Sequence, residues 1–277
     1  GRDRSSIEYN GEYNPWETET SMPKISGEIF PDGDFYLTKE ESAMIAQVKQ
    51  HFSRIAVVLN IGGIIDTSWI KNDDQISSAL IAWQGGMEGG NAFADLISGT
   101  VTPSGKLTDT WATHYNDYPS ADTFSYLSGD LSFNDYKEGI YIGYRWFDAE
   151  QKHLRYPFGF GLSYTSFSHT VQDISVDGTC VTVKAAVCNT GDTCCGKEVL
   201  QLYLAKPCGQ IDHERKGLVA FGKTKSLKPG ESEALSFTFD LSEQGSFDEE
   251  GAAFILEKGE YGLLFGDSSV SAEPIAV

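Results

Sequence analysis

The stretch RIAVVLNIGG, residues 54–63, decides the fold class of this chain. Its run of apolar residues from Ile55 to Leu59 is almost continuous and ends close to paired glycines. Such a run is typical of a strand that is covered on both faces, as in a parallel sheet. Residues 54–63 therefore predict a parallel strand inside an α/β unit.

The neighbouring sequence repeats this alternation of helix and strand. Upstream, in residues 35–52, Thr38 and Glu41 have the spacing of a capping box, and apolar residues then recur at helical spacing. Downstream, ISSALIAWQGG (76–86) predicts a second strand with a glycine turn, and MEGGNAFADLISG (87–99) predicts a helix. Together these segments predict a three-layer α/β sandwich, with the first helix packed on the sheet.

The pattern of apolar and turn-forming residues changes after Gly161. Short alternating runs are now separated by Gly, Pro, Asn and Asp. In EALSFTFDL (233–241) every second residue from Leu235 to Leu241 is apolar, which is the period of a half-buried strand. This half of the chain is therefore predicted to be an all-β sandwich. The aromatic and glycine-rich residues 136–167 are too apolar for a flexible linker, so we expect a packed junction there.

Composition limits the classes of partner. The 277 residues carry a net charge of −19, which repels nucleic acid and anionic lipid surfaces and favours a neutral substrate. No apolar run approaches the roughly 20 residues that span a bilayer. We therefore expect neither a nucleic acid partner nor a membrane span.

The five cysteines lie in one part of the second half, and their odd number cannot be fully paired within the chain. Their spacing matches no zinc motif, so free thiols are the favoured interpretation over a metal site. We predict no metal and no cofactor. Free thiols favour a cytoplasmic location, although secretion stays open because a longer parent chain can carry a signal segment.

Two further motifs have ordinary structural interpretations. GGMEGG, residues 85–90, suggests a phosphate-binding turn, but Glu88 stands where a cation is needed and no G-x-G-x-x-G spacing follows. A tight turn is favoured over a nucleotide site. The five histidines are scattered and lie beside no recognisable nucleophile, so we assign them no catalytic role.

Acidic and aromatic residues gather in residues 8–34. Glu28 lies there with Tyr9, Tyr13 and Trp16. Paired carboxylates perform acid/base chemistry on sugars, and a pyranose stacks on aromatic rings. From the residues alone, however, a solvated loop with docked aromatic side chains is the favoured interpretation.

Several ordered blocks nevertheless resemble one family. Four of them, together covering much of the first 167 residues, resemble the second and third domains of glycoside hydrolase family 3, the β-glucosidases and their relatives. NTGDTCCGKEVLQLYL (189–204) and LKPGESEALSFTFDLSE (227–243) resemble the fibronectin type III-like domain of the same family. The four blocks are RIAVVLNIGGIIDTSWI (54–70), ALIAWQGGMEGGNAFADLISGTVTPSGKLTDTW (79–111), YKEGIYIGYRWFD (136–148) and YPFGFGLSYTSF (156–167).

The resemblance implies a retaining mechanism in which an aspartate on a TIM-like barrel is the nucleophile and a glutamate in the α/β sandwich is the acid/base. Nothing in the chain resembles the barrel segment that carries the nucleophile. The family pattern S-G-E-G-x-D-R is matched only from GRDR (1–4), so the acid/base is expected to be the residue just before Gly1. Glu28, at the end of ISGE (25–28), is the second candidate.

The remaining implied site residues are few. Arg2 and Asp3 are expected to orient the acid/base loop, and Tyr9, Tyr13 and Trp16 to border the leaving-group side of the substrate cleft. We list these five as candidate substrate-binding residues. An ordinary surface ion pair is the alternative for the first two.

The resemblance also implies a domain plan and a function. Residues 1–34 are the expected acid/base loop region, 35–118 the α/β sandwich, 119–164 the junction and 165–277 the fibronectin type III-like domain. The implied function is the C-terminal part of an exo-acting β-glucosidase-like enzyme that hydrolyses β-linked glucosides or oligosaccharides. Its expected partners are the missing TIM-like barrel or a chain that carries it, and a second copy in a homodimer.

Two alternatives stay open. One is a non-catalytic carbohydrate-binding or assembly module derived from such an enzyme. The other is a nucleotide-binding α/β protein, which rests only on the glycine turns. The sugar specificity cannot be read from these residues, because family membership alone is a weak guide to substrate.

Overall fold

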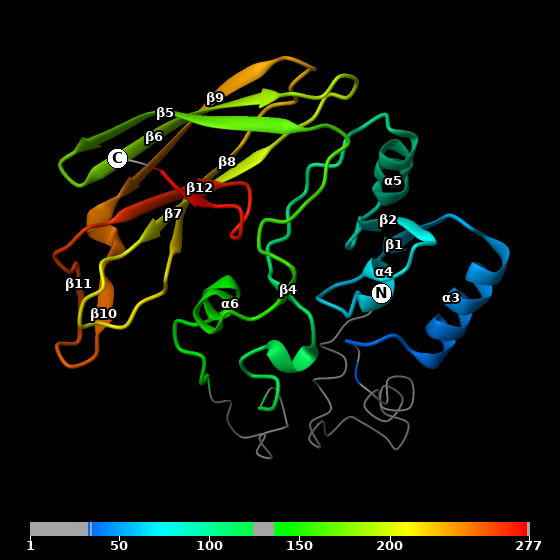
Figure 1. Cartoon of the computed structure of the whole chain (residues 1–277), viewed down its shortest axis with the longest axis horizontal. Helices are drawn as coiled ribbons and strands as arrows, with labels where there is room; N and C mark the ends of the chain where they lie inside the picture. The colour runs from blue at the N-terminus through cyan, green and yellow to red at the C-terminus, as the bar shows by residue number, and fades with distance from the viewer. Residues whose placement is uncertain (1–32, 34, 124–135, 276–277) are drawn as a thin grey trace. The chain divides into compact units, whose positions relative to one another are not determined.

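The computed structural model of the chain describes residues 33, 35–123 and 136–275 (Figure 1). These residues form two compact units. The first comprises the described residues of Gly1–Ala94 and Trp111–Glu138, and the second those of Asp95–Thr110 and Gly139–Val277.

The first unit is an α/β structure built on a parallel pair of strands. β1 and β2 pair in parallel, with Val57 opposite Ala79, as the continuous apolar run predicted. Its elements are, in chain order, α3 (Lys39–His51), β1 (Ile55–Leu59), α4 (Ser68–Lys71), β2 (Ile76–Ile81), β3 (Trp111–Ala112) and the short 3-10 helix η1 (Tyr115–Asp117). Helix α5 (Gly89–Ser98) begins in the first unit and ends in the second, and it lies within the segment 87–99 that was predicted to be helical.

Helix α3 begins at the predicted capping box. The Thr38 hydroxyl accepts a hydrogen bond from the Glu41 amide at 3.2 Å, and the Glu41 carboxylate accepts one from the Thr38 amide at 2.8 Å. At the other end of the helix, Lys49 forms an ion pair with Asp73 in the loop before β2. The hydrogen bond from Lys49 is the largest cause that lowers the pKa of the Asp73 carboxyl.

Strand β1 differs from the expectation in one respect. Leu59 is buried and Val57 half-buried, whereas Ala56 and Val58 are exposed. Cover on both faces needs a second layer over Ala56 and Val58, and the described part of the chain leaves both side chains open. The strand thus carries more apolar side chains than the described residues around it bury.

The second unit is dominated by a two-sheet sandwich. One sheet has four strands in the order β13-β12-β7-β8, and the other has three in the order β5-β6-β9, with antiparallel pairing throughout. Two antiparallel sheets with seven strands are typical of an immunoglobulin-like sandwich. The elements of the unit are α6 (Tyr144–Glu150), β4 (Leu154–Tyr156), β5 (Phe167–Asp177), β6 (Cys180–Asn189), β7 (Val199–Ala205), β8 (Gly217–Lys223), β9 (Ser232–Asp240), η3 (Leu241–Gln244), β10 (Ser246–Asp248), β11 (Ala253–Ile255), β12 (Gly262–Gly266) and β13 (Glu273–Pro274).

Alternate residues of the strands form the core between the two sheets. On β9, Phe237 and Phe239 are buried while Ser236 and Thr238 are exposed, so the two-residue period predicted for this segment is confirmed. The opposite sheet contributes Leu202 of β7, which is fully buried in the same cluster. Burial of each such side chain contributes about 1.5–3 kcal/mol to folding.

The segment 95–110 packs against the sandwich through a buried ion pair. Lys106 Nζ lies 2.9 Å from Glu198 Oε1 and also donates to the Gly161 carbonyl at 3.1 Å. The side chains of Lys106 and Glu198 are only 13% and 9% exposed. A pair buried this deeply depends on both partners, because removal of either one leaves an uncompensated charge.

Candidate functional site

The site residues predicted from the sequence lie outside the described part of the chain. The structure therefore does not test their roles or their mutual positions, and the catalytic assignment stays a prediction. These residues are Glu28, Arg2, Asp3, Tyr9, Tyr13 and Trp16.

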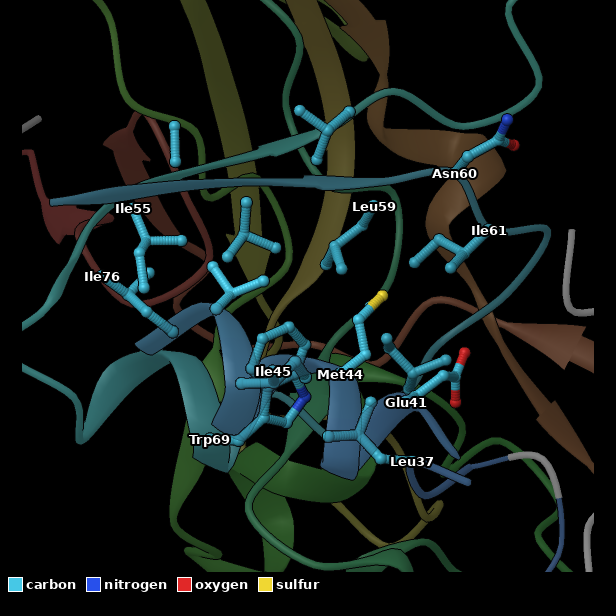
Figure 2. A pocket seen from close by; sticks show the side chains of 15 residues that line it. Leu37, Glu41, Met44, Ile45, Ile55, Leu59, Asn60, Ile61, Trp69 and Ile76 are labelled. Carbon is cyan, nitrogen blue, oxygen red and sulfur yellow. The ribbon is translucent and has the colours of Figure 1, made fainter. Parts of the chain in front are cut away.

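The first unit contains an apolar groove between α3 and β1. The groove has a volume of about 610 Å³, and Figure 2 shows side chains from the helix and the strand facing each other across it. Its lining residues are Leu37, Glu41, Met44, Ile45, Val48, Ile55, Ala56, Val57, Val58, Leu59, Asn60, Ile61, Ile65, Trp69 and Ile76.

The groove runs along β1. All residues of β1, Ile55–Leu59, line it. Successive side chains of a strand point to opposite faces, so the backbone of β1 borders the groove together with its side chains. Among the described strands, β1 pairs only with β2, which leaves its other edge available for a further strand.

The groove has few polar groups that are free to bind a ligand. Glu41 already caps α3, and the Trp69 indole N–H donates to the Asp66 carbonyl at 3.0 Å. Figure 2 shows Glu41 and Asn60 toward the same end of the groove. A sugar needs several hydrogen-bonding partners, so this lining suits apolar side chains of a polypeptide better than a carbohydrate.

Several residues of the groove remain exposed. Met44 on α3 is 57% exposed, and Val58 on β1 is 39% exposed. Both side chains line the groove, and an exposed apolar lining of this kind is typical of an interaction surface. We therefore treat the groove as the candidate docking site of the first unit.

Other kinds of site find no support in the residues that the structure covers. Across residues 33, 35–123 and 136–275, no group of three or more His, Cys, Asp or Glu side chains is placed to hold a metal ion. The five cysteines are unpaired thiols, and Cys180, Cys195 and Cys208 are exposed. None of the helices within these ranges is both long and apolar enough to cross a bilayer.

The class of protein defined by the fold is an α/β unit with an open apolar groove, followed by a seven-stranded antiparallel sandwich. The glycosyl hydrolase family 3 C-terminal domain matches residues 16–164, and the fibronectin type III-like domain matches residues 198–269. The chain belongs to glycoside hydrolase family 3.

The similar proteins are β-glucosidases. Beta-glucosidase A of Butyrivibrio fibrisolvens is 42% identical over an alignment of 265 residues, and the match covers 87% of this chain and 31% of that protein. The beta-glucosidase of Ruminococcus albus is 37% identical over an alignment of 249 residues, and the match covers 87% of this chain and 25% of that protein. The structure of a beta-glucosidase from Paenibacillus barengoltzii matches with a TM-score of 0.82 and 42% identity, covering 88% of this chain and 27% of that one.

These comparisons confirm the predicted family and fold class, an α/β sandwich followed by a fibronectin type III-like sandwich. The chain spans between a quarter and a third of the length of these relatives. The groove itself was not predicted. The only sign of it in the sequence is a surplus of apolar residues. Met44 on α3 and Val58 on β1 stand beside the apolar residues that the predicted packing of helix on sheet already uses.

Proposed function

We propose that this chain is the C-terminal part of a retaining, exo-acting β-glycosidase of the β-glucosidase type, which hydrolyses β-linked glucosides when it is joined to a nucleophile-bearing barrel. One observation carries the proposal: almost the whole chain matches β-glucosidases, yet it spans only 25–31% of the first two relatives. An aspartate nucleophile and a glutamate acid/base must lie about 5–5.5 Å apart for retention. The proposed enzyme therefore needs the barrel and the acid/base loop together.

The groove supports the idea that further polypeptide completes the α/β unit. In parallel sheets, consecutive strands are joined through a helix that packs on the sheet, and sequential strands are usually neighbours. Helix α3 directly precedes β1, so a strand that precedes α3 is expected to lie beside the free edge of β1. Such a strand would extend the sheet beyond β1 and border the groove on that side.

The same proposal includes the acid/base residue, the domain boundaries and the homodimer that were predicted from the sequence. The acid/base is proposed to be the residue that precedes Gly1 in a longer polypeptide, with Glu28 as the second candidate. The domain boundaries at residues 34, 118 and 164 are likewise proposed. A homodimer is also proposed. The second copy can occupy the groove only where the rest of the enzyme does not occupy it.

A chimeric enzyme tests the proposed function. In beta-glucosidase A of Butyrivibrio fibrisolvens, the segment that this chain matches is replaced by the chain itself, and hydrolysis of an aryl β-glucoside is measured. We expect kcat/KM within about tenfold of the parent enzyme, a difference of about 1.4 kcal/mol in transition-state stabilisation, and no hydrolysis by the chain alone. Glu28→Gln in the chimera should leave this activity nearly unchanged, whereas loss of a true general acid costs about 10²–10⁴-fold.

The outcome that contradicts the proposal is equally specific. If the chimera is folded but inactive, and the isolated chain binds cello-oligosaccharides, the chain is a carbohydrate-binding module and not part of a hydrolase. The matching segment of the parent enzyme, expressed alone, is the control for sugar binding by an isolated C-terminal part.

A further inference from the structure

The carboxyl ends of β1 and β2 lie side by side at one edge of the first unit. The two strands pair up to their last residues, and beyond them the Ala82 amide still donates to the Leu59 carbonyl at 2.8 Å. Asn60 and Trp83 come next, so they leave the sheet from neighbouring strands, which lie about 4.8 Å apart. Figure 2 shows Asn60 at this end of β1. In open α/β sheets, ligands bind at this edge, outside the carboxyl ends of the strands.

Trp83 has a backbone conformation that a bulky residue rarely adopts. Its φ is +49°, in the left-handed region, which costs an L-residue about 1–2 kcal/mol. Residues held in such a conformation cluster at ligand sites, where the surrounding structure fixes them. Here the tight turn that follows does so, because Gly86 has φ +65° and a Cβ on Gly85 would lie 2.9 Å from Gly89 Cα. The chain thus accepts a conformational cost that a glycine would avoid, and it presents an indole ring at this edge.

The side chains at this edge combine apolar surface with unused polar groups. Trp83 is 36% exposed, and Met87 in the turn is fully exposed. Asn60 and Gln84 are also exposed. Within the described residues, neither of their side-chain amides forms a hydrogen bond, and nor does the Trp83 indole N–H. The edge therefore offers the face of an aromatic ring together with free donors and acceptors.

These groups fit a neutral sugar. The faces of a β-glucosyl ring carry C–H bonds and are apolar, so one face can pack on an indole ring while the hydroxyl groups at the rim exchange hydrogen bonds with amides. Glu88, whose carboxylate accepts a hydrogen bond from Asn91 Nδ2 at 2.6 Å, adds an exposed acceptor to the turn. Its negative charge and the net charge of −19 both disfavour an anionic ligand.

We propose that the carboxyl edge of β1 and β2 binds one glucosyl unit of a β-linked oligosaccharide, with Trp83 as the stacking platform and Asn60 and Gln84 as hydrogen-bond partners. The choice of sugar rests on the proposed function. Trp83 is a binding residue and takes no part in proton transfer, because an indole N–H only donates hydrogen bonds. An open edge covers one side of the ligand, so the chain alone should bind weakly, and the barrel-bearing polypeptide would cover the other side.

The direct test titrates the full 277-residue chain with cellotetraose. ¹H–¹⁵N NMR of the indole groups reports each tryptophan side chain separately, and Trp83→Phe assigns the Trp83 signal. We expect this signal to move and to saturate with a Kd of about 1–10 mM, while the signal of Trp111, which is 1% exposed, stays in place. Sorbitol, which has hydroxyl groups but no ring face, is the control ligand. A Trp83 signal that does not move up to about 30 mM cellotetraose, or that moves equally with sorbitol, would overturn the proposal.

Two substitutions at exposed positions make the test specific and spare the core. Gln84→Ala removes one side-chain amide, so the Kd for cellotetraose should rise by about two- to tenfold. Phe221→Ala, at a 72% exposed position on β8, removes an aromatic ring elsewhere and should leave the Kd unchanged. Equal effects of the two substitutions would contradict the assignment of the site.

The chimeric enzyme separates this inference from the proposed function. In an active chimera, Trp83→Ala should raise the KM for cellotetraose by at least about tenfold and leave kcat within about twofold, because stacking stabilises the bound substrate and the transition state alike. An unchanged KM in the folded variant would overturn the inference and leave the proposed function standing. An inactive chimera beside a saturable Trp83 signal in the chain would contradict the proposed function and leave the sugar site standing.

Discussion

Asn189→Asp should destabilise the sandwich severely at pH 7, although it replaces only the side-chain NH₂ group with an oxygen. Asn189 at the end of β6 is fully buried and uses its whole amide. Its Nδ2 donates to the carbonyls of Cys194 and Leu227, each at 2.9 Å. Its Oδ1 accepts from the Thr165 hydroxyl at 2.6 Å and from the Gly191 amide at 3.1 Å.

The substitution replaces the donating nitrogen with an oxygen that faces two carbonyl oxygens. The Cys194 carbonyl loses the donor that Asn189 supplies, whereas the Leu227 carbonyl keeps the Gly196 amide at 3.0 Å. An unsatisfied buried group costs about 1–3 kcal/mol. The introduced charge adds a desolvation cost. We therefore expect a loss of at least about 4 kcal/mol in the free energy of unfolding, measured by urea denaturation at pH 7. Typical domains have a free energy of unfolding of about 5–15 kcal/mol, so this loss is a large part of it.

Acid should reverse part of this loss. A protonated carboxyl can donate one hydrogen bond, so the difference between the variant and the unmodified chain should narrow from pH 7 to pH 4.5. Asn72→Asp, at the exposed end of α4, adds the same charge and should change the free energy of unfolding by less than about 0.5 kcal/mol. Equal effects of the two substitutions would contradict the role given to Asn189.

Gly159→Ala should have the second large effect, for two separate reasons. Gly159 is buried and has φ +86°, a backbone conformation that L-residues rarely adopt. An added Cβ would also lie 2.6 Å from Gln201 Nε2 and 2.8 Å from Ser268 Cα. The conformational cost is about 1–2 kcal/mol and the overpacking cost about 1–3 kcal/mol. We expect a total loss of about 2–5 kcal/mol in urea denaturation.

Two other glycines separate these costs. Gly178 has φ +63° and open space around the Cβ position, so Gly178→Ala should show only the conformational cost. At Gly161 an added Cβ would lie 2.3 Å from the Gly105 carbonyl oxygen, and Gly161→Ala should show mainly the steric cost. If Gly159→Ala costs no more than Gly178→Ala, the close approach to Ser268 does not matter for stability.

Much of the fold could be predicted because local patterns encode it. The capping box at Thr38 and Glu41 sets the start of α3, and the alternation in β9 sets which of its side chains are buried. These features depend on neighbours within a few residues. The pairing of β1 with β2 follows from the same kind of pattern, a continuous apolar run that ends in glycines.

Other features depend on residues far apart in the chain and could not be predicted. The buried Lys106–Glu198 pair joins two charged residues that, in the sequence alone, are indistinguishable from surface charges. The two carbonyl oxygens that His213 contacts are backbone atoms, which the sequence does not reveal. The groove was missed because an apolar residue such as Val58 signals burial, but not what covers it.

The central claim, that the groove receives the rest of a β-glucosidase, has a direct test in a binding measurement. The part of the Butyrivibrio fibrisolvens relative that this chain does not match is expressed as a separate polypeptide and titrated with this chain. A charge placed in a desolvated apolar groove costs several kcal/mol, so Val58→Asp should weaken binding by at least about 100-fold. Val176→Asp, at a 63% exposed position on β5, should leave the affinity unchanged. Undiminished binding by the folded Val58→Asp chain would contradict the account.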